Sequence, residues 1–475
     1  MKKQAYNPYL PSWEHVPDGE PHVFGDRIYI YGSHDRSHGT TFCMEDYVCW
    51  SAPVDDLGNW KYEGVIWKKT DDPNNRKPVG YLYAPDVAQG PDGRYYLYYF
   101  FTHDGTRPFE IGVAVCNTPA GRYEYYGTIA LENGKQFITF DPAVLVDDDK
   151  RVWLYYGSAF QMGGNMFHAL GGAVVELAQD MKTVLSKPKL TVPNMFHQKG
   201  TSFAGHAFFE ASSIRKVNGK YYLIYSSMAS NELCYATSDK PDGPFTYGGV
   251  LVSNGDIGYQ GRKKAVAPAG NNHGSIECIQ GQWYVFYHRH TQGSSYARQG
   301  CAETIAILPD GSIPQVEITS CGLNGGAFRA EGVYEASICC NLTDGKAGKK
   351  SAPTCVDEER EMQELVSFVS NLKDGSEAGY KYFDFTDKVT LHIVWRTSLA
   401  SFSDFQRLSP DKCRMNGKIL ISTEAGGKPV AEIAVENAAG DWETSSVCLK
   451  LTGKKALYFR YQGKGAVDIR EFSFL

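Results

Sequence analysis

A recurring strand pattern in roughly the first 320 residues constrains the fold more than any other feature of this sequence. Each copy is a polar or glycine-containing turn followed by an aromatic and β-branched run, which is typical of a hairpin leading into a strand. The five copies lie at residues 25–31, 92–98, 150–155, 218–224 and 280–286. Their central aromatic residues are Tyr29, Tyr96, Trp153, Tyr222 and Tyr284, spaced 57 to 69 residues apart. A repeat of this length predicts five β-propeller blades of about four strands each.

Two further patterns complete the predicted organisation. Residues 53–64, 118–127 and 240–249 follow their anchors at similar distances, as outer strands of equivalent blades would. Beyond residue 326 the repeat stops, and alternating runs at 388–395 and 456–461 between glycine-rich turns favour a β-sandwich. We therefore predict an all-β chain, with a five-bladed β-propeller over residues 1–322 followed by a β-sandwich over 327–475.

Composition narrows the possible partners. Lys and Arg total 48 against 54 Asp and Glu, a net charge of −6 without blocks of one sign, which argues against nucleic acid or an anionic membrane as partner. No apolar segment follows Lys2 and Lys3, so we predict no secretory signal and expect a cytoplasmic protein. The 12 cysteines form no Cys-x-x-Cys pair and are expected to be reduced thiols in the core.

Side chains that could take part in catalysis occur at the same position in several copies of the repeat. Eleven or twelve residues before the blade anchors lie Asp18, Asp141, Glu210 and His273, while blade two has Ala84 and Pro85 followed by Asp86. Innermost propeller strands line a central channel, so equivalent positions should converge there. Each residue alone has a structural explanation, such as a turn at Asp18. Together, carboxyl groups that raise one another's pKa favour acid–base chemistry, such as cleavage of a glycosidic bond.

Residues 18–33, 83–86, 140–142, 210–213 and 272–275 resemble the motifs of family 43 glycoside hydrolases in type, order and spacing. This resemblance covers about 320 residues and implies an inverting enzyme on a five-bladed propeller. It implies Asp18 as general base, Asp141 as the residue that orients the acid and tunes its pKa, and Glu210 as general acid. Many members have proline directly after the base, whereas Gly19 follows Asp18 here and Glu20 precedes Pro21. Counting back from the turn at residues 26–27 favours Asp18, and Glu20 remains the competing candidate.

The resemblance extends to residues around the site. Arg298 fits the family's arginine that pairs with the active carboxylates, although a surface arginine is the alternative. His273 matches a histidine beneath the site that often holds calcium through water, although a lone imidazole is a poor calcium ligand. Five residues near the motifs could wall the sugar pocket, or could equally be packing: Trp13, His34, Asp35, Phe140 and His206.

The segments 329–332, 457–461 and 469–474 resemble a family 6 carbohydrate-binding module, which could bind sugar or merely support the propeller. Our leading hypothesis is an exo-acting α-L-arabinofuranosidase that takes short arabinose-bearing, arabinoxylan-type oligosaccharides. The alternatives are a β-D-xylosidase, a catalytically silent sugar-binding propeller, and a phosphorylase, which would need a basic phosphate site. The sequence leaves the oligomeric state open.

Overall fold

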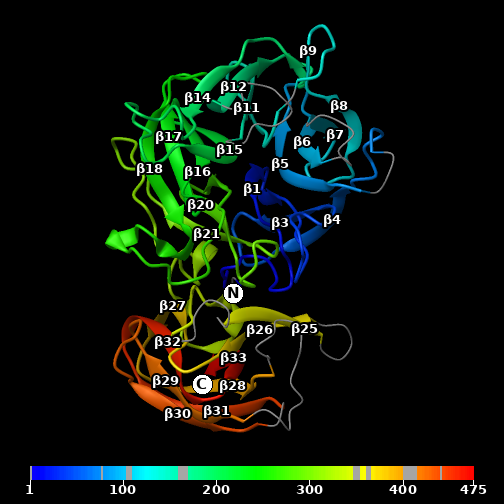
Figure 1. Cartoon of the computed structure of the whole chain (residues 1–475). Coiled ribbons are helices and arrows are strands. Elements are labelled where there is room, and N and C mark those ends of the chain that lie inside the picture. The colour runs from blue at the N-terminus through cyan, green and yellow to red at the C-terminus, as the bar shows by residue number, and fades with distance from the viewer. Residues whose placement is uncertain are drawn as a thin grey trace.

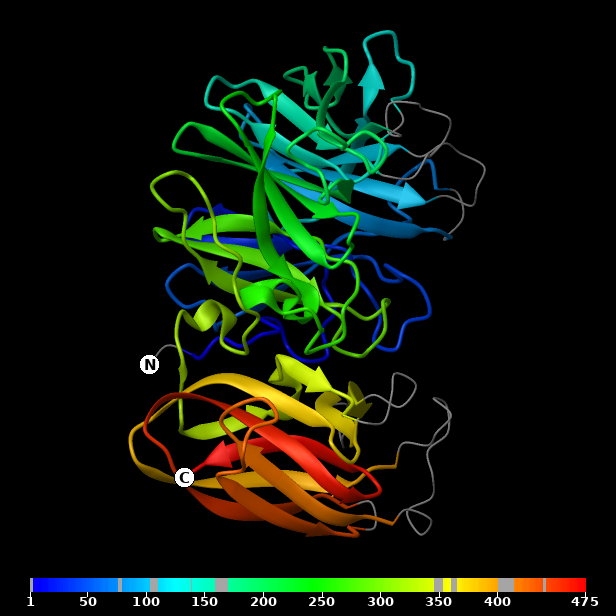
Figure 2. The same ribbon diagram turned by 60° about the vertical axis from the view of Figure 1, so that its left-hand side comes forward.

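The computed structural model describes residues 3–75, 79–102, 110–137, 139–158, 170–345, 353–359, 365–399, 414–438 and 441–475. Five sheets form a ring, and two further sheets pack together beside it (Figure 1 and Figure 2). Complete helical segments within the described ranges are short 3-10 turns: η2 (Asn254–Asp256), η3 (Tyr259–Gly261), η4 (Gly322–Asn324) and η5 (Ala336–Ile338). Within these ranges no helix has the length and apolar character needed to cross a membrane. The predicted all-β class is confirmed.

Each repeat forms one blade. Blade one contains β1 (Glu20–Phe24), β2 (Arg27–Tyr31), β3 (Tyr47–Pro53) and β4 (Lys61–Trp67). Blade two contains β5 (Tyr81–Gln89), β6 (Tyr95–Thr102), β7 (Ile111–Cys116) and β8 (Glu124–Thr128). Blade three contains β10 (Ala143–Val146), β11 (Val152–Tyr156) and β12 (Gly171–Leu177), extended by β9 (Ala130–Leu131), β13 (Thr183–Val184) and β14 (Lys189–Pro193).

Blade four contains β15 (Phe208–Val217), β16 (Lys220–Ser227), β17 (Glu232–Ser238) and β18 (Thr246–Ser253). Blade five contains β19 (Ser275–Ile279), β20 (Gln282–Arg289) and β21 (Gln299–Ile305). The first strands of the blades contact one another in the closed order β1, β5, β10, β15, β19 and back to β1. This ring of inner strands surrounds the propeller axis.

The blade anchors lie on the second strand of each sheet, where alternate side chains pack between neighbouring blades. Trp153 and Tyr155 of blade three, for example, share a core with Leu223 and Tyr225 of blade four. Burying each large apolar side chain stabilises the fold by about 1.5–3 kcal/mol. The segments predicted as outer strands end in β4, β8 and β18, as expected.

Blade five has three strands where about four were predicted, and the chain's N-terminal segment covers its edge. Tyr9 N donates to Gly300 O at 3.1 Å. The Asn7 side chain donates to Ala302 O at 2.8 Å and accepts from Ala302 N at 2.9 Å. These bonds satisfy backbone groups of β21 that an exposed edge strand would leave open. The two ends of the ring are thereby joined.

Residues after the propeller form two stacked sheets. One contains β22 (Phe328–Arg329), β24 (Asn341–Thr343), β27 (Glu377–Phe385), β29 (Asn416–Ser422), β30 (Ala431–Glu436) and β32 (Gly453–Lys464). The other contains β23 (Gly332–Glu335), β25 (Thr354–Glu359), β26 (Leu365–Leu372), β28 (Lys388–Thr397), β31 (Glu443–Lys450) and β33 (Val467–Phe474). A shared core that includes Phe383, Phe459 and Phe472 lies between them. The predicted β-sandwich is confirmed, with the runs at 388–395 and 456–461 in β28 and β32.

The cysteines agree with the expectation of reduced thiols. Eleven of them fall within the described ranges and are free, most of them buried, while Cys413 lies outside these ranges.

Candidate active site

Strand register divides the residues around the axis into two tiers. Glu20, Asp86, Ser213 and Ser275 lie opposite the residue two positions after the anchor of their blade, namely Tyr31, Tyr98, Ile224 and Phe286. We call these four the lower tier. Asp18, Asp141, Glu210 and His273 lie two or three residues before the corresponding position of their blades, and we call them the upper tier. Asp18 and Glu20 therefore belong to different tiers.

The backbone is kinked at the level of the upper tier. Asp18, Asp141 and Ala211 have φ angles of 55°, 48° and 68°, in the left-handed region that residues other than glycine rarely adopt. Strand β15 also shifts register on both sides of Glu210. Such conformations cost on the order of 1–3 kcal/mol each and persist where the surrounding structure holds them. Bulges and kinks of this kind re-aim side chains and are frequent beside active sites.

Asp18 is buried among three basic side chains. Its Oδ1 lies 2.9 Å from Arg298 Nη1, 3.2 Å from His288 Nδ1 and 3.9 Å from His273 Nδ1. Burial alone would raise the pKa of Asp18, but the Arg298 guanidinium and the His288 hydrogen bond outweigh it and hold this pKa well below its usual range. Asp18 is therefore a buried but ionised carboxylate.

Arg298 is fixed by Asp35, which the sequence placed in the pocket wall. Arg298 donates from Nε to Asp35 Oδ2 at 2.8 Å and from Nη2 to Asp35 Oδ1 at 3.1 Å. The Asp35 side chain is fully buried, and the ring centroid of Phe42 lies 4.8 Å from the guanidinium carbon. This two-point pairing leaves Nη1 directed at Asp18. Asp35 thus holds the arginine and does not present a free face to a pocket.

Asp141 and Glu210 form the other half of the upper tier. Ala211 N donates to Asp141 Oδ2 at 3.0 Å, which ties Asp141 to the residue after Glu210. Burial and then the charge of Glu210 raise the pKa of Asp141 well above its usual range. Burial and then the charge of Asp18 raise the pKa of Glu210 to about 7, although Arg298 opposes this. The pair therefore retains a proton near neutrality, and the Ala211 N–H favours negative charge on Asp141 and the proton on Glu210.

Two histidines lie beside Asp18. Burial, together with the nearby charges of His288 and Arg298, lowers the pKa of His273 to about 4 although Asp18 opposes the shift, so its imidazole is neutral. His288 Nε2 lies 2.9 Å from Asn271 O, and its Nδ1 lies 3.2 Å from Asp18 Oδ1 and 3.3 Å from Asp18 N. Our sequence analysis missed His288. It lies four residues after the anchor Tyr284 on β20, and this even spacing along a strand could have placed it on the same face.

Four predicted wall residues have partners outside the upper tier. Trp13 is 41% exposed and packs on Trp50 with ring centroids 6.1 Å apart. His34 lies between Glu14 Oε1 and Asp46 O, each at 2.8 Å. Phe140 packs edge-on against Phe100, and His206 pairs with Glu232 at 2.9 Å and stacks on Tyr247. Contact of these four residues with sugar stays a prediction.

Glu20, the competing base, pairs in the lower tier. Its Oε2 accepts from Ser213 Oγ at 3.1 Å and from Arg215 Nη2 at 3.3 Å, and Arg215 also pairs with Glu277 at 3.2 Å. Burial, aided by the charge of Asp86 and opposed by Arg215, raises the pKa of Glu20 to about 8. A carboxyl that is protonated at neutral pH cannot take a proton from water, so the geometry favours Asp18.

Candidate metal ligands occur at three places in the described chain. The ligand atoms of Glu20, His22 and Asp86 lie within 4.8 Å of one another, as do those of His206, Glu232 and Cys234. In the first group His22 Nε2 already lies 2.8 Å from Asp86 Oδ1, and Arg215 supplies a cation to Glu20.

The third place is the segment of the neutral His273 and its chain neighbours Asn271 and Asn272. Glu20 Oε1, Asn271 Oδ1 and Asn272 Oδ1 are buried oxygen atoms for which no hydrogen-bond partner occurs among the described residues. Uncharged oxygen atoms beside a neutral imidazole are donors that suit a hard cation such as calcium.

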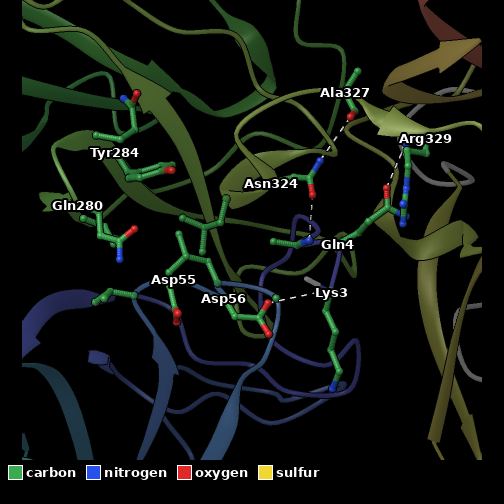
Figure 3. A pocket seen from close by; sticks show the side chains of 16 residues that line it. Lys3, Gln4, Asp55, Asp56, Gln280, Tyr284, Asn324, Ala327 and Arg329 are labelled. Atoms are coloured by element: carbon green, nitrogen blue, oxygen red, sulfur yellow. Dashed lines mark hydrogen bonds between the residues drawn. The ribbon is translucent and has the colours of Figure 1, made fainter. Parts of the chain in front are cut away.

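A separate cavity of about 520 Å³ is lined by the N-terminal segment, by blades one and five, and by residues 323–329 after the propeller (Figure 3). Its lining includes Asp55, Asp56, Gln280, Tyr284 and Arg329, and it shares no residue with the upper tier. The carboxyl groups of the upper tier therefore lie apart from this cavity.

The chain is similar to known proteins over most of its length. Residues 14–313 match the family model described as glycosyl hydrolases family 43. The whole chain is 44% identical to a xylosidase/arabinosidase from Thermoclostridium stercorarium, with 100% of this chain and 99% of that protein covered.

Solved structures agree. A GH43 β-xylosidase/α-arabinofuranosidase from a compost microbial metagenome, in complex with xylotriose and in a calcium-free form, aligns with a TM-score of 0.54 and 28% identity, covering 64% of this chain and 96% of that one. An arabinoxylan arabinofuranohydrolase from Bacillus subtilis, in complex with cellotetraose, aligns over 98% of this chain and 96% of its own with a TM-score of 0.51. At 22% identity the latter supports the fold alone.

Proposed function

The chain belongs to family 43 of the glycosyl hydrolases, and we propose that it is an inverting, exo-acting α-L-arabinofuranosidase for arabinose-bearing, arabinoxylan-type oligosaccharides. Glycoside hydrolase activity follows from the family. The identity of the released sugar, the exo mode of action and the inversion at the anomeric carbon are our proposal. The observation that carries the acid–base chemistry is the geometry of the upper tier, where Arg298 Nη1 lies 2.9 Å from Asp18 Oδ1 and Ala211 N holds Asp141 at 3.0 Å. Asp18 is ionised, whereas the Asp141–Glu210 pair keeps a proton near neutrality.

This division assigns a task to each carboxyl. Glu210 gives its proton to the glycosidic oxygen as the bond to the sugar breaks, and Asp18 takes a proton from the water that attacks the opposite face. Asp141, held by Ala211 N, keeps negative charge beside Glu210 and so keeps the proton on the acid before reaction. Inverting enzymes need about 6.5–9.5 Å between acid and base to admit this water.

Arg298 and Asp35 prepare the base. A guanidinium anchored at two points by Asp35 keeps its third nitrogen on Asp18, so the carboxylate is both ionised and oriented before substrate arrives. Neither side chain needs to contact sugar for this effect.

We also propose a calcium ion near His273, held by its neutral imidazole and, through water, by the partnerless oxygens of Asn271, Asn272 and Glu20. When bound, the ion would supply positive charge beneath the site. The relative described in a calcium-free form supports the idea that such proteins bind calcium.

Specificity is tested by paired assays with 4-nitrophenyl α-L-arabinofuranoside and 4-nitrophenyl β-D-xyloside. A β-D-xylosidase is the second candidate, because the names of two relatives above carry both activities. We expect a higher kcat/KM on the arabinofuranoside; a tenfold preference for the xyloside would overturn the first choice. A silent sugar-binding propeller would show neither activity, and its Glu210→Gln variant would match the unchanged protein.

The second set of sheets and the location of the protein complete the proposal. We propose that the sandwich is a module like those of family 6 and that the enzyme acts in the cytoplasm on imported oligosaccharides. Cell fractionation tests this location, and recovery of the activity from the culture medium would contradict it.

A further inference from the structure

A carboxylate of the sandwich is buried in the propeller. Asp357 on β25 has a side chain that is only 4% exposed. Its Oδ2 accepts from Gln292 Nε2 at 2.7 Å and from Ser37 Oγ, and lies 3.5 Å from His15 Nε2. Its Oδ1 accepts from Ser367 Oγ on the neighbouring strand β26. One side chain of the sandwich thus gathers three separate segments of the propeller.

The surrounding backbone is joined in the same way. Cys355 N on β25 donates to Thr291 O of the propeller at 3.2 Å. Ser367 Oγ also contacts Ser12 O at 3.1 Å. Figure 1 shows β25 and β26 on the side of the sandwich that faces the propeller. Asp357 is therefore part of a built interface and not an isolated contact.

The three gathered segments are those that carry the upper-tier base and its arginine. His15 precedes Asp18 by three residues, and its carbonyl accepts from Asp35 N at 2.9 Å. Ser37 follows Asp35 by two residues, and Gln292 lies on the loop that ends at Arg298. The segments are also bonded to each other, since Gln292 donates to Ser37 Oγ at 3.0 Å and accepts from His38 N at 2.9 Å.

The charge at this position is held. Burial would raise the pKa of Asp357, but hydrogen bonds from His15, Ser367 and Ser37 outweigh it and lower this pKa. A buried carboxylate is tolerated only when its partners satisfy it, so the segments that supply those partners must keep their places. Without Asp357, buried donors on all three segments would lose their common acceptor.

We propose that Asp357 is a positioning residue for the hydrolase site, acting from the sandwich to fix the segments that hold Asp18, Asp35 and Arg298. The sandwich then completes the catalytic propeller, beyond any sugar it binds. This inference rests on the proposed function, because it assumes that Asp18 and Arg298 serve the reaction.

The test compares Asp357→Ala with a matched substitution elsewhere in the sandwich. Asp468 on β33 is equally buried and satisfied by Ser370, Asn371 and Arg396, all within the sandwich. At a temperature well below unfolding of every variant, we expect Asp357→Ala to lower kcat at least tenfold with KM changed less than threefold. Asp468→Asn should leave both constants within twofold although it lowers the melting temperature.

Two further variants separate positioning from simple destabilisation. Asp357→Asn can keep the acceptor for Gln292 and Ser37 while the Ser367 hydroxyl rotates to accept, so it should recover most of kcat. Gln292→Ala should lower kcat about fivefold alone and add less than twofold to Asp357→Ala, because both act through one network. In the Asp468→Asn background, Gln292→Ala should lower kcat by the same factor as it does in the unchanged enzyme. These measurements carry the test if Asp357→Ala fails to fold.

The outcomes are distinguishable. If Asp357→Ala keeps kcat within twofold of Asp468→Asn, or if Gln292→Ala leaves kcat unchanged, the inference is overturned while the proposed function stands. Absence of turnover by the unchanged chain on both aryl glycosides would overturn the proposed function, and the inference with it.

Discussion

Replacing Arg298 by methionine tests the upper tier most directly. Arg298 is the main cation of two buried carboxylates, with three side-chain hydrogen bonds to Asp35 and Asp18 between 2.8 and 3.1 Å. Removing one partner of a buried ion pair costs about 3–5 kcal/mol. With about 2.1 cal/mol/K of unfolding entropy per residue, each kcal/mol lowers the melting temperature of a propeller of about 320 residues by about 1.5 °C, so we expect a fall of about 4–8 °C.

The same substitution should move the pH profile of kcat/KM. Burial raises the pKa of Asp18, and the charge of Arg298 is the largest effect that lowers it. Without Arg298 this pKa rises, and the acidic limb of the profile moves to higher pH. Arg298 also opposes the raised pKa of Glu210, which is about 7, so the basic limb near pH 7 moves to higher pH as well. Activity needs Asp18 ionised and Glu210 protonated, and therefore the whole bell should shift toward alkaline pH.

Arg215→Met provides the control. It removes a buried arginine that pairs with Glu20 and Glu277 in the lower tier, and it should lower the melting temperature without moving either limb. The assay is kcat/KM on an aryl arabinofuranoside between about pH 4 and 9, with thermal melts of both variants. An Arg298→Met profile with limbs in the original places would refute our reading of Asp18 and Glu210.

Four other expectations follow from the same geometry. Glu210→Gln should lower kcat about 10²–10⁴-fold on substrates with poor leaving groups and less on 4-nitrophenyl glycosides, which need little acid help; equal losses on both would contradict its role as acid. Asp18→Asn should cost a similar factor, whereas Glu20→Gln should stay within about tenfold of the unchanged enzyme, and the reverse ranking would make Glu20 the base. Burial lowers the pKa of His290 in the folded protein to about 4, below its ordinary value of about 6.5, so the stability that the neutral imidazole contributes is complete above pH 6.5 and is lost as pH falls toward 4. In urea unfolding, the free energy of unfolding of His290→Gln should therefore depend on pH less than that of the unchanged protein, by up to about 3 kcal/mol. An unchanged pH dependence would contradict this. Calcium chloride should raise the melting temperature of the unchanged protein but not of His273→Ala, and equal shifts would place the ion elsewhere.

The blades could be predicted because their signal is local. A turn followed by a strand with alternating aromatic residues predicts a hairpin from a few neighbouring residues. Five copies of this pattern at similar spacing predict the ring of blades. Closure of the ring could not be predicted in this way. It depends on Asn7 and Ala302, which are 295 residues apart, and on a side chain that imitates a strand.

The candidate site was predictable to the extent that it follows the repeat. Counting back from the anchors found the upper tier, and register with Tyr31 now places Glu20 one pleat away from Asp18. His288 was within reach of the same counting, taken forward along the strand. Asp357 was not, because its partners His15 and Ser37 are 342 and 320 residues away and no periodic signal links a sandwich to a propeller.

The two tiers show how the surroundings of a carboxyl group, rather than its residue type, set its pKa. Each tier offers a carboxyl beside an arginine. Asp18 lies beside His288 and His273 as well as Arg298, and together they lower its pKa despite burial. Burial and then the nearby charge of Asp86 raise the pKa of Glu20 to about 8, although an arginine that Glu277 also uses lies 3.3 Å away and opposes the rise. A negative base above a neutral carboxyl meets less repulsion than it would above a second anion. The lower tier thus helps to keep Asp18 ionised while the Asp141–Glu210 pair holds its proton.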